Sequence, residues 1–120
     1  MATRKQGQGS KWIRPTTRLA IYLRDGMACV YCGHAVEEGE RLTLDHVRPA
    51  SRQGQNAPTN LVTCCSHCNS VRGNRPLRTW CHDVAGYTRQ DAAAIERRVR
   101  AHARRALPRE AARALIAERI

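Results

Sequence analysis

The chain has 120 residues, the size of one domain with a short extension. Its 21 lysines and arginines outnumber ten acidic residues, so the formal net charge is +11, which favours a polyanionic partner such as nucleic acid. No apolar run approaches the ~18 residues that a membrane span needs, and residues 1–10 lack the apolar core of a secretory signal. We therefore expect a cytoplasmic protein without an integral membrane segment.

The predicted elements follow a basic, flexible arm at residues 1–14. A short helix is expected over Thr16–Arg24, where apolar residues share one face. Strands are predicted over Arg41–Val47 and Asn60–Thr63, because both segments are rich in apolar and β-branched residues. The polar segment Ala50–Thr59 between them contains glycine and proline and predicts a loop.

The C-terminal part, residues 81–120, is expected to be a basic helical extension. Thr88 and Asp91 resemble a capping box and predict a helix that ends before Pro108, where a second helix follows. Residues 88–120 contain nine arginines against four acidic residues. Two interpretations remain open: the charged face lies along DNA, or it is an ordinary solvated face of a helix that packs on the domain or on a second subunit.

Two pairs of thiols, Cys29-x-x-Cys32 and Cys65-x-x-Cys68, have the spacing of zinc knuckles. In a small chain of a reducing compartment, two such pairs favour a metal over disulfides. Four thiolates would fill a tetrahedral zinc and leave no position for water, so the predicted zinc is structural. Cys64 is an alternative ligand with poorer spacing. Cys81 and His82 are left without a predicted role.

The 32 residues between the two pairs carry Asp45-His46 and Asn60, and Asn69 directly follows Cys68, the second cysteine of the second pair. A neutral imidazole can accept a proton near pH 7, because its pKa is ~6.5. One carboxylate and one amide oxygen suit Mg²⁺ or Mn²⁺ that is held partly by water and phosphate. Neighbouring strand residues point to opposite sides, so Asp45 and His46 can approach a phosphate from different directions. Taken singly, each residue could instead be surface, a turn or a helix cap.

This constellation resembles the HNH, or ββα-metal, endonucleases, with Asn69 as the third letter of the motif. His46 and Asn60 lie fourteen residues apart, and Asn60 and Asn69 nine. The resemblance implies an α+β fold: a ββα-metal core at residues 15–80, stapled by the four-cysteine zinc, with an N-terminal helix and the C-terminal extension. It also implies that His46 is the general base, that Asp45 and Asn69 bind the catalytic divalent ion, and that Asn60 braces the loop.

The resemblance further implies hydrolysis of DNA phosphodiester bonds, by nicking, or by double-strand cleavage in a homodimer. Small free-standing members of this kind occur in phages and prophages, which suggests a cytoplasmic role in DNA packaging with terminase subunits as partners. The alternatives are a non-catalytic zinc-dependent nucleic-acid-binding module and a nuclease of the restriction or homing type; an RNA or junction substrate also remains open. Four arginines near the motif are candidate phosphate contacts, with solvated surface as the alternative: Arg48, Arg52, Arg72 and Arg75.

Overall fold

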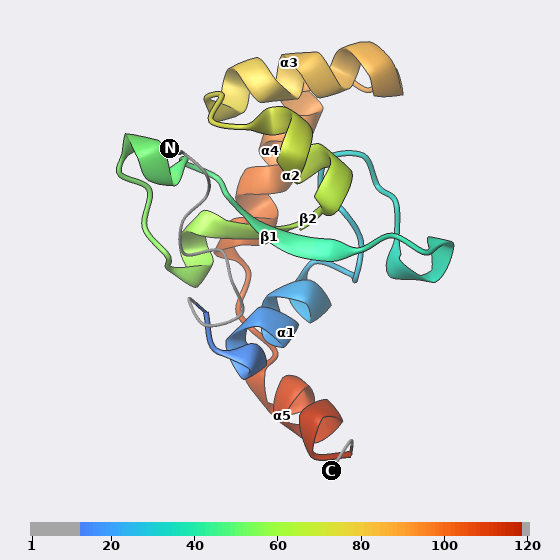
Figure 1. Cartoon of the computed structure of the whole chain (residues 1–120), viewed down its shortest axis with the longest axis vertical. Coiled ribbons are helices and arrows are strands. Elements are labelled where there is room, and N and C mark those ends of the chain that lie inside the picture. Colours follow the sequence, from blue (N-terminus) through green and yellow to red (C-terminus); the bar gives the residue numbers. More distant parts are fainter. Residues whose placement is uncertain (1–12, 119–120) are drawn as a thin grey trace.

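A two-stranded antiparallel sheet lies at the centre of the computed structural model, which describes residues 13–118 (Figure 1). Strand β1 (Leu42–His46) pairs with β2 (Leu61–Cys65), so that Leu42 lies opposite Cys65 and His46 opposite Leu61. Both predicted strands are confirmed, and β2 runs two residues further, to the first cysteine of the second pair. The α+β class and the order strand, strand, helix agree with the expectation from sequence.

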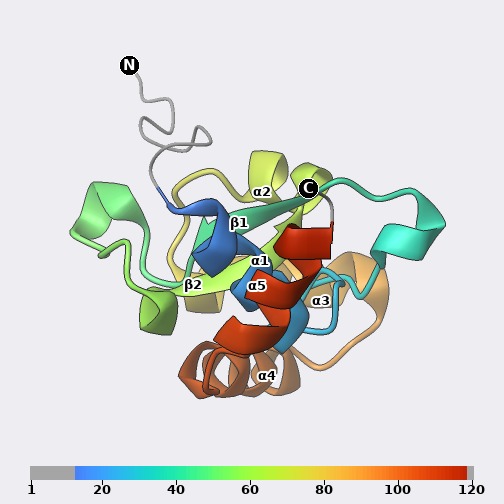
Figure 2. The same ribbon diagram turned by 90° about the horizontal axis from the view of Figure 1, so that it is seen from below.

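Helices cover the sheet from several sides (Figures 1 and 2). Helix α1 (Pro15–Arg24) packs against β2 and against α5 (Arg109–Glu118). Helix α2 (Ser66–Arg72) begins directly after β2 and lies against both strands. Helix α3 (Leu77–Thr88) packs on α4 (Ala92–Arg104), which also contacts β2. Single 3₁₀ turns lie in the connecting segments, at Val36–Glu38, Ala50–Arg52 and Pro58–Asn60.

The alternation of side chains along the strands gives the sheet two different faces. Leu44 and Leu61 pack with Ile13 and Ile21 on the side of α1. The other face contributes Val62 to a larger core that also contains the cysteine pairs and the buried side chains of α3 and α4. The helices that follow residue 80 therefore share a hydrophobic core with the cysteines. Among residues 13–118, no helix is long and apolar enough to cross a membrane.

Helix α3 was not predicted, and the start of α4 was misplaced. Thr88 is the last residue of α3, and its hydroxyl donates to the carbonyl of Val84 rather than capping a new helix. Arg89 then adopts a left-handed conformation with φ 61°, which ends α3. Asp91 is itself the N-cap of α4, where its carboxylate accepts from the backbone N–H of Ala94 at 2.9 Å. The predicted capping box of Thr88 and Asp91 is therefore wrong, although a helix does follow.

Candidate active site

The four predicted zinc ligands come together on one side of the sheet. The sulfur atoms of Cys29, Cys32, Cys65 and Cys68 all lie within 4.8 Å of one another, and those of Cys32 and Cys65 are 3.8 Å apart. Ligands at ~2.3 Å from a tetrahedral ion are ~3.8 Å from each other, so this spacing is compatible with a bound zinc. Cys64 lies outside the group of four, fully buried, with its thiol donating to the carbonyl of Cys65.

The cysteines of this cluster shift one another's pKa in opposite directions. Hydrogen bonds from the side chains of Cys64, first, and of Cys65 lower the pKa of Cys29. The same hydrogen bond to Cys29 raises the pKa of Cys65, and burial raises the pKa of Cys64 well above its usual value. A metal bound among the four sulfurs would favour the thiolate form of all its ligands.

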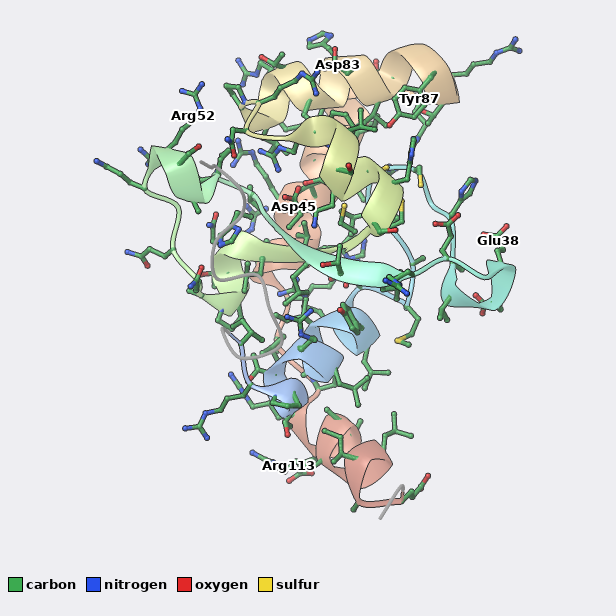
Figure 3. The ribbon with its side chains drawn as sticks, in the orientation of Figure 1. Glu38, Asp45, Arg52, Asp83, Tyr87 and Arg113 are labelled. Atoms are coloured by element: carbon green, nitrogen blue, oxygen red, sulfur yellow. The ribbon has the colours of Figure 1, made fainter. Side chains whose placement is uncertain are left out.

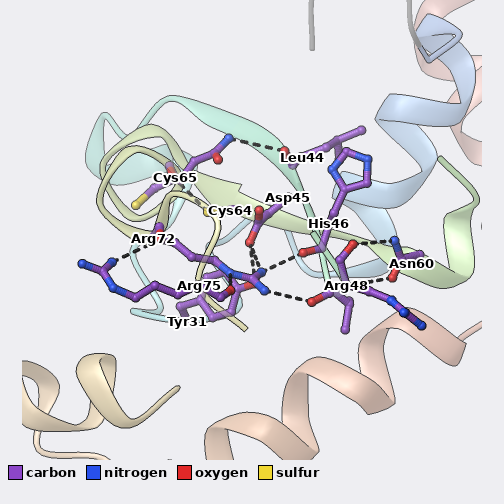
Figure 4. A network of polar contacts seen from close by, with 12 residues as sticks. Tyr31, Leu44, Asp45, His46, Arg48, Asn60, Cys64, Cys65, Arg72 and Arg75 are labelled. Carbon is purple, nitrogen blue, oxygen red and sulfur yellow. Dashed lines mark hydrogen bonds and ion pairs between the residues drawn. The ribbon is translucent and has the colours of Figure 1, made fainter. Parts of the chain in front are cut away.

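Asp45 lies at the centre of a buried polar network between the sheet and α2 (Figure 4). Its Oδ2 accepts from Nη1 of Arg72 at 2.7 Å and from the hydroxyl of Tyr31 at 2.6 Å. Burial, together with the negative charge of Asp45, raises the pKa of Tyr31 well above its usual value, so the phenol stays protonated and donates. Tyr31 lies between Cys29 and Cys32, and the network therefore connects the cysteine cluster to Asp45.

Arg72 is buried, and its guanidinium donates hydrogen bonds to groups of the protein. Besides Asp45, it donates to the carbonyls of His46 at 2.7 Å, Val47 at 2.9 Å and Arg75 at 3.0 Å. With only 1% of its surface exposed, it cannot reach a phosphate on a bound nucleic acid. This corrects the grouping of Arg72 with the candidate phosphate contacts, because Arg72 is the last residue of α2 and lies on the buried face of that helix with Cys68 and Asn69. It fixes the end of β1 instead.

His46 and Asn69 lie at the same end of the sheet as Asp45. The side chains of Asp45 and His46 leave β1 on opposite sides, as predicted (Figure 4). Nε2 of His46 is 2.7 Å from Oδ1 of Asn56, a loop residue that the sequence did not single out. Asn69, in α2, donates from its amide to the carbonyl of Leu44 at 3.4 Å, so its side chain lies against β1 beside Asp45. Asp45 and His46 therefore extend from opposite sides of β1 (Figure 4), and Asn69 contacts the backbone of the same strand from α2.

Asn60 holds the loop between the strands in place. Its Oδ1 accepts from the backbone N–H of Arg48 at 2.9 Å, and its Nδ2 donates to the carbonyls of Arg48 at 3.1 Å and Gln55 at 2.9 Å. A hollow of about 250 Å³ lies beside these contacts and is lined in part by Arg48 and Asn60. Each of these three hydrogen bonds joins the Asn60 side chain to a backbone group, which suits a residue that braces the loop.

Three of the four candidate phosphate contacts are exposed around this loop. Arg48 donates to the carbonyl of Arg52 at 2.7 Å, and Arg52 projects outward from the edge of the molecule (Figure 3). Arg75 lies at an exposed position before α3, where it pairs with Asp83 at 3.4 Å. Contact of these three arginines with phosphate stays a prediction.

Three hydrogen bonds, from Arg98 of α4 and from Gln90 just before that helix, reach the first cysteine turn and have no counterpart in the sequence analysis. Arg98 donates to the carbonyls of Val30 at 2.9 Å and Tyr31 at 3.2 Å, and Gln90 donates to Tyr31 at 3.0 Å. These bonds hold the first cysteine turn from the side of the C-terminal helices. Only the spatial proximity of residues more than fifty positions apart could reveal them.

Comparison with known proteins assigns the segment that carries this geometry. Residues 29–75 match the family model described as HNH endonuclease, and this span includes all four clustered cysteines and the Asp45, His46 and Asn69 constellation. The segment is an HNH endonuclease domain.

Two CRISPR-associated endonucleases Cas9 are similar to this HNH domain. The chain is 33% identical over 63 residues to that of Corynebacterium diphtheriae and 38% identical over 64 residues to that of Actinomyces naeslundii. Each match covers 52% of this chain but 6% of the relative. The crystal structure of the Type II-C Cas9 enzyme from Actinomyces naeslundii matches with a TM-score of 0.45 and 24% identity, over 84% of this chain and 12% of that one. The chain thus corresponds to a small part of these relatives.

Proposed function

We propose that this chain is an endonuclease that hydrolyses DNA phosphodiester bonds, with His46 as the general base. The observation that carries the proposal is a strand, strand, helix unit that matches the HNH family model, with Asp45 and His46 on β1 and with Asn69 on α2 in contact with the backbone of β1. The membership supports nuclease activity in general. We add to this the nature of the substrate, the identity of the metals and the role of each residue.

The division of labour follows from the two sides of β1. His46 removes a proton from the attacking water, which a neutral imidazole can do near pH 7. Asp45 and Asn69 offer one carboxylate and one amide oxygen, a hard donor set that fits Mg²⁺ or Mn²⁺. A divalent cation held there would stabilise the charge that develops on the departing 3′ oxygen. Arg72 and Tyr31 both engage Oδ2 of Asp45 and fix the orientation of the carboxylate in advance.

The four-cysteine cluster is proposed to hold a structural zinc. A closed shell of four thiolates offers no place for a reacting water, so this metal supports the fold rather than the chemistry. Cys68 immediately precedes Asn69, and Tyr31 lies between Cys29 and Cys32 in the sequence. The zinc would therefore fix the backbone on both sides of the catalytic carboxylate.

DNA is the proposed substrate because exposed arginines surround the end of β1. Arg48, Arg52 and Arg75 can contact phosphates and give salt-sensitive binding without base recognition. A single site of this kind cuts one strand, so nicking is the expected product of a monomer and double-strand cleavage that of a homodimer. A role in phage DNA packaging with terminase subunits, and a cytoplasmic location, remain predictions from sequence.

The test is cleavage of supercoiled plasmid in Mg²⁺ and then in Mn²⁺. The wild type should give nicked circles, and His46→Ala should cut at least ~100-fold more slowly, the usual contribution of a general base. Asp45→Asn is the matched metal-site variant, because an amide oxygen can still accept from Arg72 while the negative charge is lost. His82→Ala, which removes an exposed histidine of α3, should cut like the wild type.

The outcomes separate the proposal from its alternative. Salt-sensitive plasmid binding without cleavage by the wild type in either metal would favour a non-catalytic nucleic-acid-binding module. Equal cleavage by the wild type and His46→Ala would contradict the assignment of the base. Zinc content and circular dichroism of each variant ensure that a loss of cutting is not a loss of folding.

A further inference from the structure

The position of His46 depends on a contact that the family motif does not name. Nε2 of His46 lies 2.7 Å from Oδ1 of Asn56, and His46 itself is only 5% exposed. An amide oxygen can only accept a hydrogen bond, so the imidazole nitrogen facing it must be the donor. A neutral imidazole that carries its proton on Nε2 has its lone pair on Nδ1. The contact therefore selects which nitrogen can take a proton from water.

The loop that presents Asn56 is rigid at several points. Asn60 donates to the carbonyl of Gln55, the residue directly before Asn56. A Cβ at Gly54 would lie 1.7 Å from the carbonyl oxygen of Arg48, so only glycine allows this close approach of the chain. Gln53 adopts the left-handed region with φ 71°, which turns the chain back toward β1. These features fix the backbone directly before Asn56, and the contact with His46 then orients the Asn56 side chain.

We propose that Asn56 is a positioning residue for His46: it orients the imidazole and holds the proton on Nε2, so that Nδ1 acts as the base. The inference rests on the proposed nuclease function and deepens it. It also gives the middle Asn60 a specific task, because the bond from Asn60 to the carbonyl of Gln55 fixes the backbone next to Asn56. Asn56 touches neither the metal ligands nor the exposed arginines in the contacts described above.

The kinetic test compares Asn56→Ala with Asn56→Asp. Loss of the acceptor in Asn56→Ala should lower kcat about 10–100-fold, the usual cost of removing a group that orients a functional histidine, with KM unchanged. Asn56→Asp keeps an acceptor at the same place and should recover most of kcat at alkaline pH, where the imidazole is neutral. Ser51→Ala, an exposed change in the same loop, is the matched control and should behave like the wild type.

A spectroscopic readout tests the contact independently of cleavage. The hydrogen-bonded Nε2 proton of His46 should give a downfield proton NMR signal that is protected from exchange with water and absent in His46→Ala. The signal should disappear in Asn56→Ala and return in Asn56→Asp. Its persistence in Asn56→Ala, or an unchanged kcat in that variant, would overturn the proposal.

The two proposals can fail separately. If Asn56→Asp behaves like Asn56→Ala in both measurements, the amide presents its nitrogen to His46 and the assigned orientation is wrong. If the wild type cuts no plasmid, the nuclease function fails, and the NMR signal alone decides whether Asn56 holds the imidazole. A wild type that cuts but shows no protected ring proton would leave the function standing and refute the role of Asn56.

Discussion

Two buried arginine–aspartate pairs lie on opposite sides of the small sheet, and they differ in how the carboxylate is held. On the side of α1, Arg24 binds both oxygens of Asp25, at 2.8 and 3.1 Å. The same guanidinium donates to the carbonyls of Pro58 at 3.0 Å and Leu61 at 2.6 Å. On the side of α2, Arg72 and Tyr31 both engage the single atom Oδ2 of Asp45.

The Arg24–Asp25 pair holds the fold together, whereas the Arg72–Asp45 pair contains a residue of the proposed site. Both oxygens of Asp25 are bound by Arg24, and Oδ2 also accepts from the backbone N–H of Thr63 at 2.8 Å. This pair joins α1 to β2 and takes no part in the proposed chemistry. Arg72 and Tyr31 both bind Oδ2 of Asp45, which directly precedes His46 in β1. A buried ion pair is therefore no sign of function by itself, because the pair of Arg24 and Asp25 joins two elements of the fold.

The largest expected difference between the two faces comes from the metal. Cys68→Ser should abolish zinc binding and unfold the protein, because structural zinc contributes apparent free energies of ~10–16 kcal/mol in small domains. On the α1 face, Ile21→Ala should cost about 2–5 kcal/mol and leave a folded protein. Thermal unfolding with zinc analysis measures both effects. Cys64→Ser, outside the cluster, should retain one zinc per chain, and a folded, metal-free Cys68→Ser would contradict the structural role.

Removing either arginine should be costly, but only one removal should affect catalysis. Arg24→Met and Arg72→Met each leave a buried carboxylate without its cation, which costs about 3–5 kcal/mol. Denaturant unfolding measures this loss. Under conditions where both variants are folded, Arg24→Met should cut plasmid with a near-normal kcat, whereas Arg72→Met should not. Equal kcat values would remove the distinction between the two pairs.

A smaller difference is expected from two tyrosines on opposite faces. Tyr31→Phe removes a buried donor to Asp45 and should destabilise the protein by about 1 kcal/mol, while changing the metal dependence of cleavage. Tyr22→Phe removes a bond of 3.3 Å to the carbonyl of Leu42 on the α1 side and should leave that metal dependence as it is. Titration of Mg²⁺ in the plasmid assay measures the effect. An identical metal response in both variants would speak against the coupling of Tyr31 to the site.

The smallest expected effect is a pH dependence of stability on the α1 side. Burial lowers the pKa of His102 below its ordinary 6.5, despite Asp25 at 3.6 Å, and the arginines Arg24, Arg98 and Arg105 oppose protonation further. The unfolded state then binds more protons than the folded state below pH ~6.5. The contribution of neutral His102 is thus present above that pH and is lost as the pH falls. His102→Gln should flatten the wild-type decline in unfolding free energy between about pH 7 and 5; an unchanged slope would contradict this.

Local patterns were sufficient wherever a few neighbouring residues decide the outcome. The helix before Cys29, both strands and the break at Pro108 follow from apolar spacing and turn residues, and the structure confirms them. Helix α3 was missed although Leu77, Trp80, Cys81 and Val84 have helical spacing and are buried. This pattern was available in the sequence, but it was overlooked between the cysteine motif and the alanine-rich segment that follows.

For the candidate site, too, some residues could be found from the local sequence and others could not. The candidates Asp45, His46, Asn60 and Asn69 came from a resemblance to a family motif whose residues lie within one stretch of the chain, and their roles stay predictions. Their partners could not be found in this way. Tyr31 and Arg72 meet Asp45 from 14 and 27 positions away, and Arg98 reaches the first cysteine turn from 67 and 68 positions away.

The sequence by itself determined the first helix, both strands, the four cysteines that cluster and the reactive types of side chain, because spacing and chemistry are properties of the chain. Only the tertiary structure decided which polar groups are buried and what each one contacts. Arg72 shows the reason. Its charge predicts a phosphate contact, but a buried guanidinium needs partners inside the protein, and it binds Asp45 and the carbonyls of His46 and Val47. Burial depends on every element packed around a side chain, and no local pattern encodes it.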